Sequence, residues 1–215
     1  MSLVLLGDYT MKFEDTEVWG FEHAIRGMRN PLESWKKSDS FIKSPHNYYV
    51  IGPNDMKLMK TLIKAGPEHR KFLRQIFISV DITAPLYWWK EFDTYKVGTV
   101  TDSCSTMHKL KDTPITVDCF EMDDYCGFFE TPWKNLIALL EQCRKEYNET
   151  KDKRYWKELI RLLPESWLQK RTVTMSYENV ANMYSQRMNH KLTEWSKDFI
   201  QWADNLPYFK ELFTV

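Results

Sequence analysis

The most constraining feature of this sequence is the stretch QIFISVDITAP, residues 75–85, in which apolar side chains recur at every second position. The alternating residues are Ile76, Ile78, Val80 and Ile82. Because successive side chains of a strand point to opposite faces, this pattern predicts a strand with one well-buried side. Pro85 stands where a helix can begin, since proline is favoured in the first helical turn. We therefore expect a helix over LYWWKEFDTYK, directly after the strand.

Apolar residues recur at helical spacing in several other segments. The predicted helices are EVWGFEHAIRGMRNP, NDMKLMKTLIKAG, TPWKNLIALLEQCRKEYN, DKRYWKELIRLLP and the whole of residues 176–207. Asn54 and Thr131 are expected N-caps, and Gly66 and Pro164 are expected stops. Short strands are predicted at LVLL, residues 3–6, and at RTVTM, residues 171–175.

The rest of the chain gives a weaker pattern. Residues 33–53 show no period and are expected to form a loop, and residues 112–130 give no clear pattern. Strands alternating with helices indicate a mixed α/β (α+β) fold. A chain of 215 residues without repeats or a low-complexity linker is expected to form a single domain, residues 1–215.

Charge and cysteine content restrict the function. Lysine plus arginine and aspartate plus glutamate both number 30, so a nucleic-acid footprint and attraction to anionic membranes are not expected. LVLL is too short to span a bilayer. The four cysteines form no CxxC pair, and the five histidines show no ligand spacing, so no metal site is expected. We expect an intracellular, cytoplasmic protein with reduced thiols.

Small hydroxyl and thiol side chains gather after the aromatic helix predicted near residue 90. The cluster comprises Thr99, Thr101, Ser103, Cys104, Ser105 and Thr106, with Asp102 inside it and His108 beyond. Such a cluster is either a polar loop that caps the helix or the lining of a ligand site. As a thiol, Cys104 is a candidate nucleophile, although a small inert side chain is the simpler interpretation.

The stretch APLYWWKEFDTYKVGTVTDSCSTMHKL, residues 84–110, resembles the signature region of the flavin-dependent thymidylate synthases. In that family a strand runs into an Ala-Pro helix start, the helix ends in Arg-His-Arg, and a run containing Ser, Asn, Glu, Ser and Arg follows. Ala84-Pro85 matches the helix start, and Thr94-Tyr95-Lys96 stands at the Arg-His-Arg position. Thr99 and Cys104 fall at the serines, Thr101 at the asparagine, Asp102 at the glutamate and Thr106 at the arginine.

The segment TMSYENVANMYSQR, residues 174–187, is similar to a second motif of that family, Thr-x-Asn-x-Arg followed by a helix bearing Asn and Arg. Ser176 stands for the first Asn and Glu178 for the first Arg. Asn182 and Arg187 keep the family spacing. Arginine forms a planar fork for phosphate, whereas lysine gives a point charge and threonine neither. Because Glu178 places a negative charge where the family has a positive one, we expect it to repel a pyrophosphate.

The resemblance implies a central sheet flanked by helices with a helical C-terminal part, assembled as a homotetramer with sites shared between subunits. It also implies methylation of dUMP to dTMP, with FAD as cofactor and NADPH and methylene-tetrahydrofolate as co-substrates. Asp102, Cys104 and Arg187 would bind the pyrimidine nucleotide, and Lys96 and Asn182 would bind the flavin. No catalytic residue is assigned. The alternative functions are binding of a nucleotide or a protein partner without flavin, and an altered enzyme acting on another pyrimidine nucleotide. Pairing with a carboxylate such as Glu178 is an alternative structural role for Arg187.

Overall fold

The computed structural model describes residues 11–43, 48–123 and 125–213. Their contacts divide the chain into two compact units. Unit 1 contains residues 11–14, 81–94 and 101–172, and unit 2 contains residues 15–80, 95–100 and 173–213. The strand expected at residues 3–6 lies outside the described residues. No helix within the described ranges is both long enough and apolar enough to cross a membrane.

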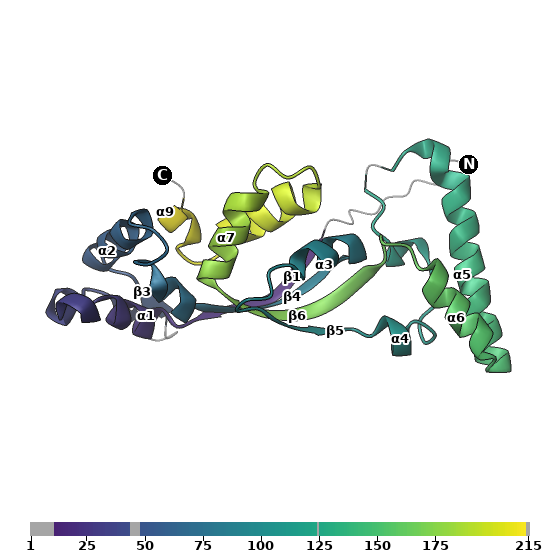
Figure 1. Cartoon of the computed structure of the whole chain (residues 1–215), viewed down its shortest axis with the longest axis horizontal. Helices are drawn as coiled ribbons and strands as arrows, with labels where there is room; N and C mark the ends of the chain where they lie inside the picture. The colour runs from purple at the N-terminus through teal and green to yellow at the C-terminus, as the bar shows by residue number, and fades with distance from the viewer. Residues whose placement is uncertain (1–10, 44–47, 124, 214–215) are drawn as a thin grey trace. The chain divides into compact units, whose positions relative to one another are not determined.

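A four-stranded antiparallel sheet in the order β1-β4-β6-β5 contributes residues to both units (Figure 1). Its strands are β1 (Lys12–Trp19), β4 (Phe77–Pro85), β5 (Val100–Ser103) and β6 (Leu168–Ser176). The alternation predicted for β4 is confirmed, since Ile78, Val80 and Ile82 are at most 1% exposed. β1 was not predicted. Its side chains are largely exposed and charged, so its sequence shows no apolar alternation. β6 is longer than predicted.

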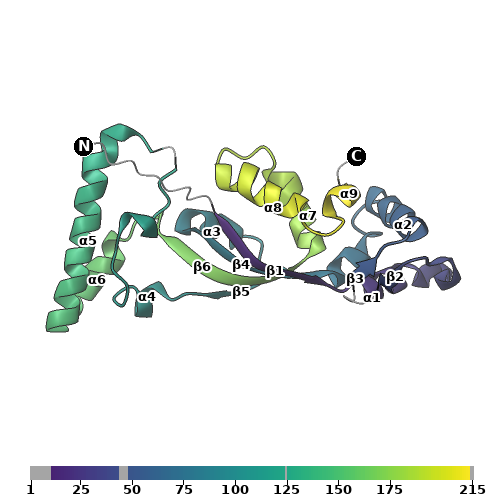
Figure 2. The same ribbon diagram turned by 180° about the vertical axis from the view of Figure 1, so that it is seen from behind.

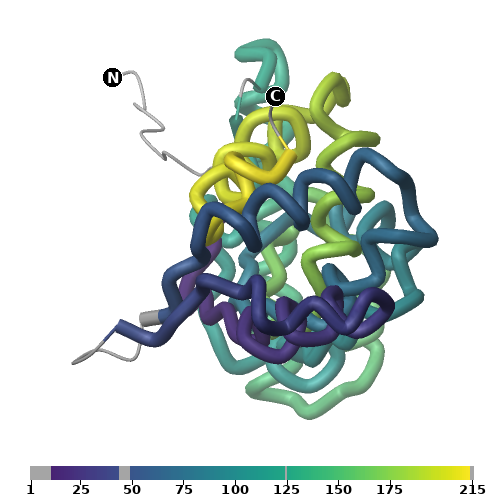
Figure 3. The backbone as a smooth tube through the Cα atoms, turned by 90° about the vertical axis from the view of Figure 1, so that its left-hand side faces the viewer, coloured from purple at the N-terminus to yellow at the C-terminus, as the bar shows by residue number. Residues whose placement is uncertain are grey.

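Unit 2 is mainly helical. Its elements are α1 (Phe21–Met28), η1 (Asn30–Leu32), η2 (Trp35–Lys37), β2 (Phe41–Lys43), β3 (Tyr48–Val50), α2 (Pro53–Lys64), η3 (Lys71–Gln75), α7 (Tyr177–Arg187), the π-helix η6 (Glu194–Phe199), α8 (Ile200–Asp204) and α9 (Phe209–Phe213). α7 and α8 pack side by side (Figure 2), and α9 packs on α2 (Figure 3). The stop predicted at Gly66 is confirmed, with φ at +104° just after α2.

Three predictions for unit 2 were wrong. The helix expected over residues 176–207 breaks after Arg187, because a turn at residues 188–193 is held by the ring of His190, which accepts a hydrogen bond from the Leu192 amide. The expected loop at residues 33–53 contains the hairpin β2–β3 and 3-10 turns, organised around the buried carboxylate of Asp55. Asn54 is not the N-cap of α2, since Gly52 holds that position.

Unit 1 contains a helical hairpin. Its elements are α3 (Leu86–Phe92), α4 (Thr106–Lys109), η4 (Val117–Cys119), η5 (Gly127–Phe129), α5 (Glu130–Thr150) and α6 (Lys153–Leu162). α5 and α6 lie against one another (Figure 1) around a small core. The core residues are Leu110, Ile115, Phe120, Leu140, Cys143 and Leu159. The expected cap Thr131 lies inside α5, because the η5 turn leads straight into the helix at Glu130.

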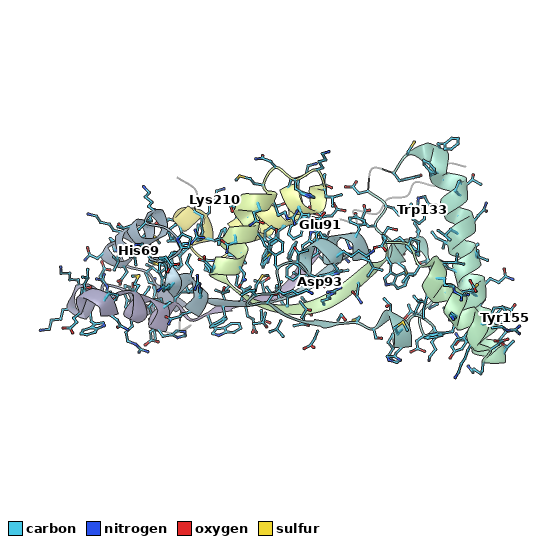
Figure 4. The ribbon with its side chains drawn as sticks, viewed as in Figure 1. His69, Glu91, Asp93, Trp133, Tyr155 and Lys210 are labelled. Atoms are coloured by element: carbon cyan, nitrogen blue, oxygen red, sulfur yellow. The ribbon has the colours of Figure 1, made fainter. Side chains whose placement is uncertain are left out.

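The helix after β4 begins as predicted, with Pro85 as its N-cap, but ends at Phe92 instead of continuing to Lys96. Thr94 ends it by donating its hydroxyl hydrogen bond to the Glu91 carbonyl oxygen, 2.7 Å away. Asp93, labelled with Glu91 in Figure 4, pairs with Arg171 at 2.9 Å. The chain is therefore free to form a separate turn at residues 95–99.

Candidate functional site

The turn at residues 95–99 is fixed to the start of α7 within unit 2. Ser176 and Asn179 form a reciprocal capping box at the N-terminus of α7. The Asn179 amide also donates a hydrogen bond to the Val97 carbonyl oxygen at 2.7 Å. Gly98 adopts φ +80°, and a Cβ there would lie 3.1 Å from Asn179 Oδ1. This arrangement places Lys96 at an exposed position on the turn.

Arg187, at the last position of α7, is held by aromatic side chains. Its Nε donates to the Tyr95 hydroxyl at 2.8 Å, and Tyr95 in turn donates to Gln186 Oε1 at 3.0 Å. The guanidinium carbon lies 4.8 Å from the ring centroid of Trp195 and 5.5 Å from that of Tyr95. Such cation–π contacts fix the orientation of a guanidinium group. Arg187 is therefore a half-buried, oriented cation.

Glu178 pairs with Arg70, on the segment between α2 and η3. Arg70 Nε lies 3.1 Å from a Glu178 carboxylate oxygen, and Arg70 Nη2 donates to Asn182 Oδ1 at 3.0 Å. The expected repulsion of a pyrophosphate by Glu178 is thus offset, because a buried carboxylate paired with a guanidinium carries little net field. The carboxylate named as an alternative partner of Arg187, Glu178, is thus paired with Arg70.

Unit 1 contains a cleft of about 350 Å³ at the end of β5. Its lining residues are Lys12, Thr83, Cys104, Ser105, Thr106, Lys109, Leu110, Thr113, Asp118, Cys119, Trp167, Leu168, Gln169 and Lys170. The Cys104 amide donates to the Lys170 carbonyl oxygen at 2.9 Å, and the Cys104 carbonyl oxygen accepts from Gln169 Nε2 at 2.7 Å. These bonds fix the backbone at Cys104 and leave its thiol exposed.

The cleft carries more positive than negative side chains, with three lysines and one carboxylate in its lining. Lys170 is held by Asp81 at 2.9 Å and by Glu14 at 3.4 Å, and the hydrogen bond that it donates to Asp81 raises the pKa of its ammonium group. Lys109 is 76% exposed and reaches Asp112 at 3.3 Å. A cavity of this size whose lining combines apolar side chains with three lysines is suited to a small anionic ligand.

One wall of the cleft is the segment at residues 110–119, which α5 holds in place. Arg144 forms two 2.7 Å hydrogen bonds with Glu141 and donates to the Lys111 carbonyl oxygen at 3.1 Å. Glu141 accepts from the Ile115 amide at 2.9 Å. The hydrogen bonds from Arg144 lower the pKa of Glu141 to about 2, because they stabilise its ionised form more than burial disfavours it.

The five predicted ligand-binding residues fall into two groups. Three lie in unit 2: Lys96 on the turn beside α7, Asn182 in the middle of α7 and Arg187 at its last position. Asp102 and Cys104 lie in unit 1, and Cys104 lines the cleft whereas Asp102 is exposed on β5 outside its lining. Within the described ranges no cluster of three or more His, Cys, Asp and Glu side chains could hold a metal ion.

Four further residues of the two candidate sites were not predicted from the sequence. Arg70 and Trp195 contact the α7 group, and Lys12 and Lys109 line the cleft. Arg70 lies 108 positions from Glu178, and a separation of that size leaves no periodic signal. The one usable signal was Glu178, which stands at an arginine position of the family. A carboxylate that becomes buried needs a cation as its partner, so a partner elsewhere in the chain could have been predicted.

Comparisons with known proteins identify the fold. No family model and no curated protein sequence matches the chain. Two structures of the flavin-dependent thymidylate synthase ThyX from Helicobacter pylori, each with FAD and dUMP, match with TM-scores of 0.71 and 0.72. They are 15% and 16% identical and cover 95% of this chain and 98% and 97% of theirs.

The UMP/dUMP methylase PolB from Streptomyces cacaoi, bound with 5-Br dUMP, matches with a TM-score of 0.62 at 13% identity, over 95% of this chain and 94% of its own. All three likenesses extend over nearly the whole length of both chains, in agreement with the order of motifs seen in the sequence. The chain therefore has the fold of the flavin-dependent thymidylate synthase ThyX.

Proposed function

We propose that this chain binds a pyrimidine nucleoside monophosphate, with dUMP as the first ligand to test. The supporting observation is the fold, which 95% of the chain shares with solved proteins bound to dUMP or 5-Br dUMP. Fold alone does not specify a ligand, so the residues must supply the chemistry. Arg187 is an oriented cation, and Cys104 lies exposed on the wall of a ligand-sized cleft.

In this proposal Asp102, Cys104 and Arg187 contact the nucleotide. Arg187 is prepared for that role, because Tyr95 and Trp195 hold its guanidinium before any ligand arrives, which lowers the entropic cost of binding. As the family resemblance implies, the proposal also includes a homotetramer in which one nucleotide contacts residues of two subunits. No residue is assigned as a catalytic acid, base or nucleophile.

The proposed reaction is methylation of dUMP to dTMP with methylene-tetrahydrofolate, FAD and NADPH. When bound, reduced FAD would supply the hydride. The residues that the resemblance assigns to the flavin are Lys96, which is exposed on its turn, and Asn182, whose Oδ1 accepts from Arg70 at 3.0 Å. Lys96 and Asn182 are the side chains that we assign to hold it.

A second candidate is a protein that binds the nucleotide or a protein partner without flavin. The observation in its favour is the segment Thr94-Tyr95-Lys96 at the family's Arg-His-Arg position, which leaves one cation of two. Tyr95 is also engaged with Arg187 and Gln186. Loss of bidentate phosphate contacts is expensive for a cofactor that carries two phosphates.

Two measurements on the purified protein separate these candidates. Calorimetry with dUMP tests nucleotide binding, and the visible absorption spectrum before and after incubation with FAD tests flavin binding. A yellow protein near unit occupancy that binds dUMP supports the enzyme. A colourless protein that binds dUMP and takes up no FAD supports the second candidate. A protein that binds neither would refute the nucleotide proposal.

Assembly is tested by light scattering. The apolar residues at helical spacing in the C-terminal part give no subunit interface, because Trp195, Phe199 and Leu206 are at most 4% exposed and belong to the protomer core. The proposal of a tetramer therefore rests on the family resemblance. A monomer at micromolar concentration would exclude a site shared between subunits.

A further inference from the structure

The unit 1 cleft carries cations that the sequence motifs do not account for. Thr106, at the position of the family's arginine, lines this cleft together with Lys12, Lys109 and Lys170. Threonine cannot neutralise a phosphate, whereas an ammonium group can. The cations of the cleft come from three separate segments, namely the start of β1, the end of α4 and β6.

We infer that Lys12 and Lys109 bind the phosphate of the nucleotide in this cleft, in place of the missing guanidinium; this inference rests on the proposed function. Lys109 is available because its pair with Asp112 is 3.3 Å long and both side chains are well exposed, a geometry that contributes little. Lys12 is exposed and forms no ion pair with the part of the chain that the structure describes. Lys170 is less available, since Asp81 and Glu14 both contact it.

The cleft can hold the phosphate without repelling it. Its lining contains three lysines and one carboxylate, Asp118. The hydroxyl groups of Thr83, Ser105 and Thr106, also in the lining, add hydrogen-bond donors. Lysine contacts phosphate as a point charge, so recognition should depend strongly on charge and weakly on geometry. Binding is therefore expected to weaken with salt, because exposed charge pairs are screened at ordinary ionic strength.

The cysteines provide a readout inside the same cleft. Cys104 and Cys119 line it, whereas Cys126 is exposed outside it. A bound nucleotide should slow alkylation of Cys104 by iodoacetamide, measured by peptide mass spectrometry, and leave Cys126 unchanged. Cys126 thus serves as an internal control for reagent access in every sample.

The experiment compares wild type with Lys12→Met, Lys109→Met and the control Lys157→Met, an exposed lysine of α6 outside the cleft. Methionine keeps much of the apolar stem and removes the charge. Each test variant should bind dUMP about tenfold more weakly, the effect of losing one charge-assisted contact. The protection of Cys104 from alkylation by bound dUMP should weaken to the same extent in these variants. Lys157→Met should behave as wild type. Thermal melting checks that all variants fold.

The ligands are dUMP, deoxyuridine and inorganic phosphate. The inference predicts that deoxyuridine binds much more weakly than dUMP, and that phosphate alone protects Cys104 at a higher concentration. If wild type binds dUMP and both test variants bind it equally well, the lysine assignment is wrong while the proposed function stands. Deoxyuridine binding as tight as dUMP would also overturn it. If wild type neither binds dUMP nor shows protection, the proposed function and this inference fall together.

Discussion

Removing the Asp55 carboxylate should destabilise unit 2 severely. Asp55 is 0% exposed and its oxygens accept hydrogen bonds from Arg29 Nε at 2.6 Å and from the hydroxyls of Ser38 and Ser40 at 2.7 Å. They also accept from the backbone amides of Asp39 and Ser40 at 3.1 Å. This one carboxylate therefore joins α1, the segment before β2 and the first turn of α2.

Asp55→Ala leaves Arg29, which is 4% exposed, as a buried cation without its carboxylate. Breaking one partner of a buried pair costs about 3–5 kcal/mol in the free energy of unfolding. For a chain of 215 residues this lowers the melting temperature by on the order of 10 °C. Calorimetry and urea unfolding followed by circular dichroism should both report the loss.

The matched control is the double variant Arg29→Met with Asp55→Ala. Because the uncompensated cation is then gone, the double variant should be more stable than Asp55→Ala alone by about 1 kcal/mol or more. A single variant that loses less than about 1 kcal/mol, or a double variant less stable than the single one, would contradict the assignment of the cost to a buried charge.

The same carboxylate gives a pH dependence. Burial acts to raise the pKa of Asp55, but the hydrogen bonds from Ser40, Ser38 and Arg29 outweigh it and hold the pKa below its ordinary value of 3.8. A lowered folded-state pKa means that the ionised carboxylate stabilises the native state above about pH 4. That stabilisation should be lost as the pH falls through the folded-state pKa, and the Asp55→Ala variant should lack this part of the acid transition.

Three further predictions concern the α7 group and the cleft wall. Arg187→Ala should weaken dUMP binding about tenfold or more in calorimetry with little loss of stability, and Arg187→Lys should restore only part of it because the planar fork is lost; equal binding by the alanine variant would make Arg187 structural. Gly98→Ala should lower the free energy of unfolding by about 1–3 kcal/mol, since φ is +80° and the new Cβ would lie 3.1 Å from Asn179 Oδ1; an unchanged melting temperature would show that the turn relaxes. Glu141→Gln should destabilise the chain at pH 7, with the difference from wild type shrinking as the pH falls from about 4.5 towards 2, because the pKa of Glu141 is lowered to about 2 by Arg144; a difference that persists at pH 2 would point to packing instead of charge.

Local patterns in the sequence were enough for the main elements. The apolar alternation of β4, the helical spacing of α2, α5 and α6, and the Ala84-Pro85 helix start predict these elements because each is a property of neighbouring residues. The order of two degenerate motifs also indicated the fold, which three solved structures confirm.

Such local patterns did not predict where elements end or which exposed segments form strands. The long C-terminal helix breaks where His190 bonds the Leu192 amide. β1 has exposed, charged residues and is a strand because its backbone is hydrogen-bonded to β4, far along the chain. Both features depend on a specific hydrogen bond or on a partner strand, neither of which leaves a period in the local sequence.

Tertiary structure alone decided the charges around the candidate sites. Tyr95 bonds Arg187 across 92 positions, and Arg70 bonds Glu178 across 108 positions. The same kind of long-range placement brings Lys12 of β1 into the lining of the same cleft as Cys104 and Lys109. The sequence shows which charged side chains exist, but whether a carboxylate repels a phosphate or is neutralised depends on which cation folding brings within about 4 Å, the range of a direct ion pair.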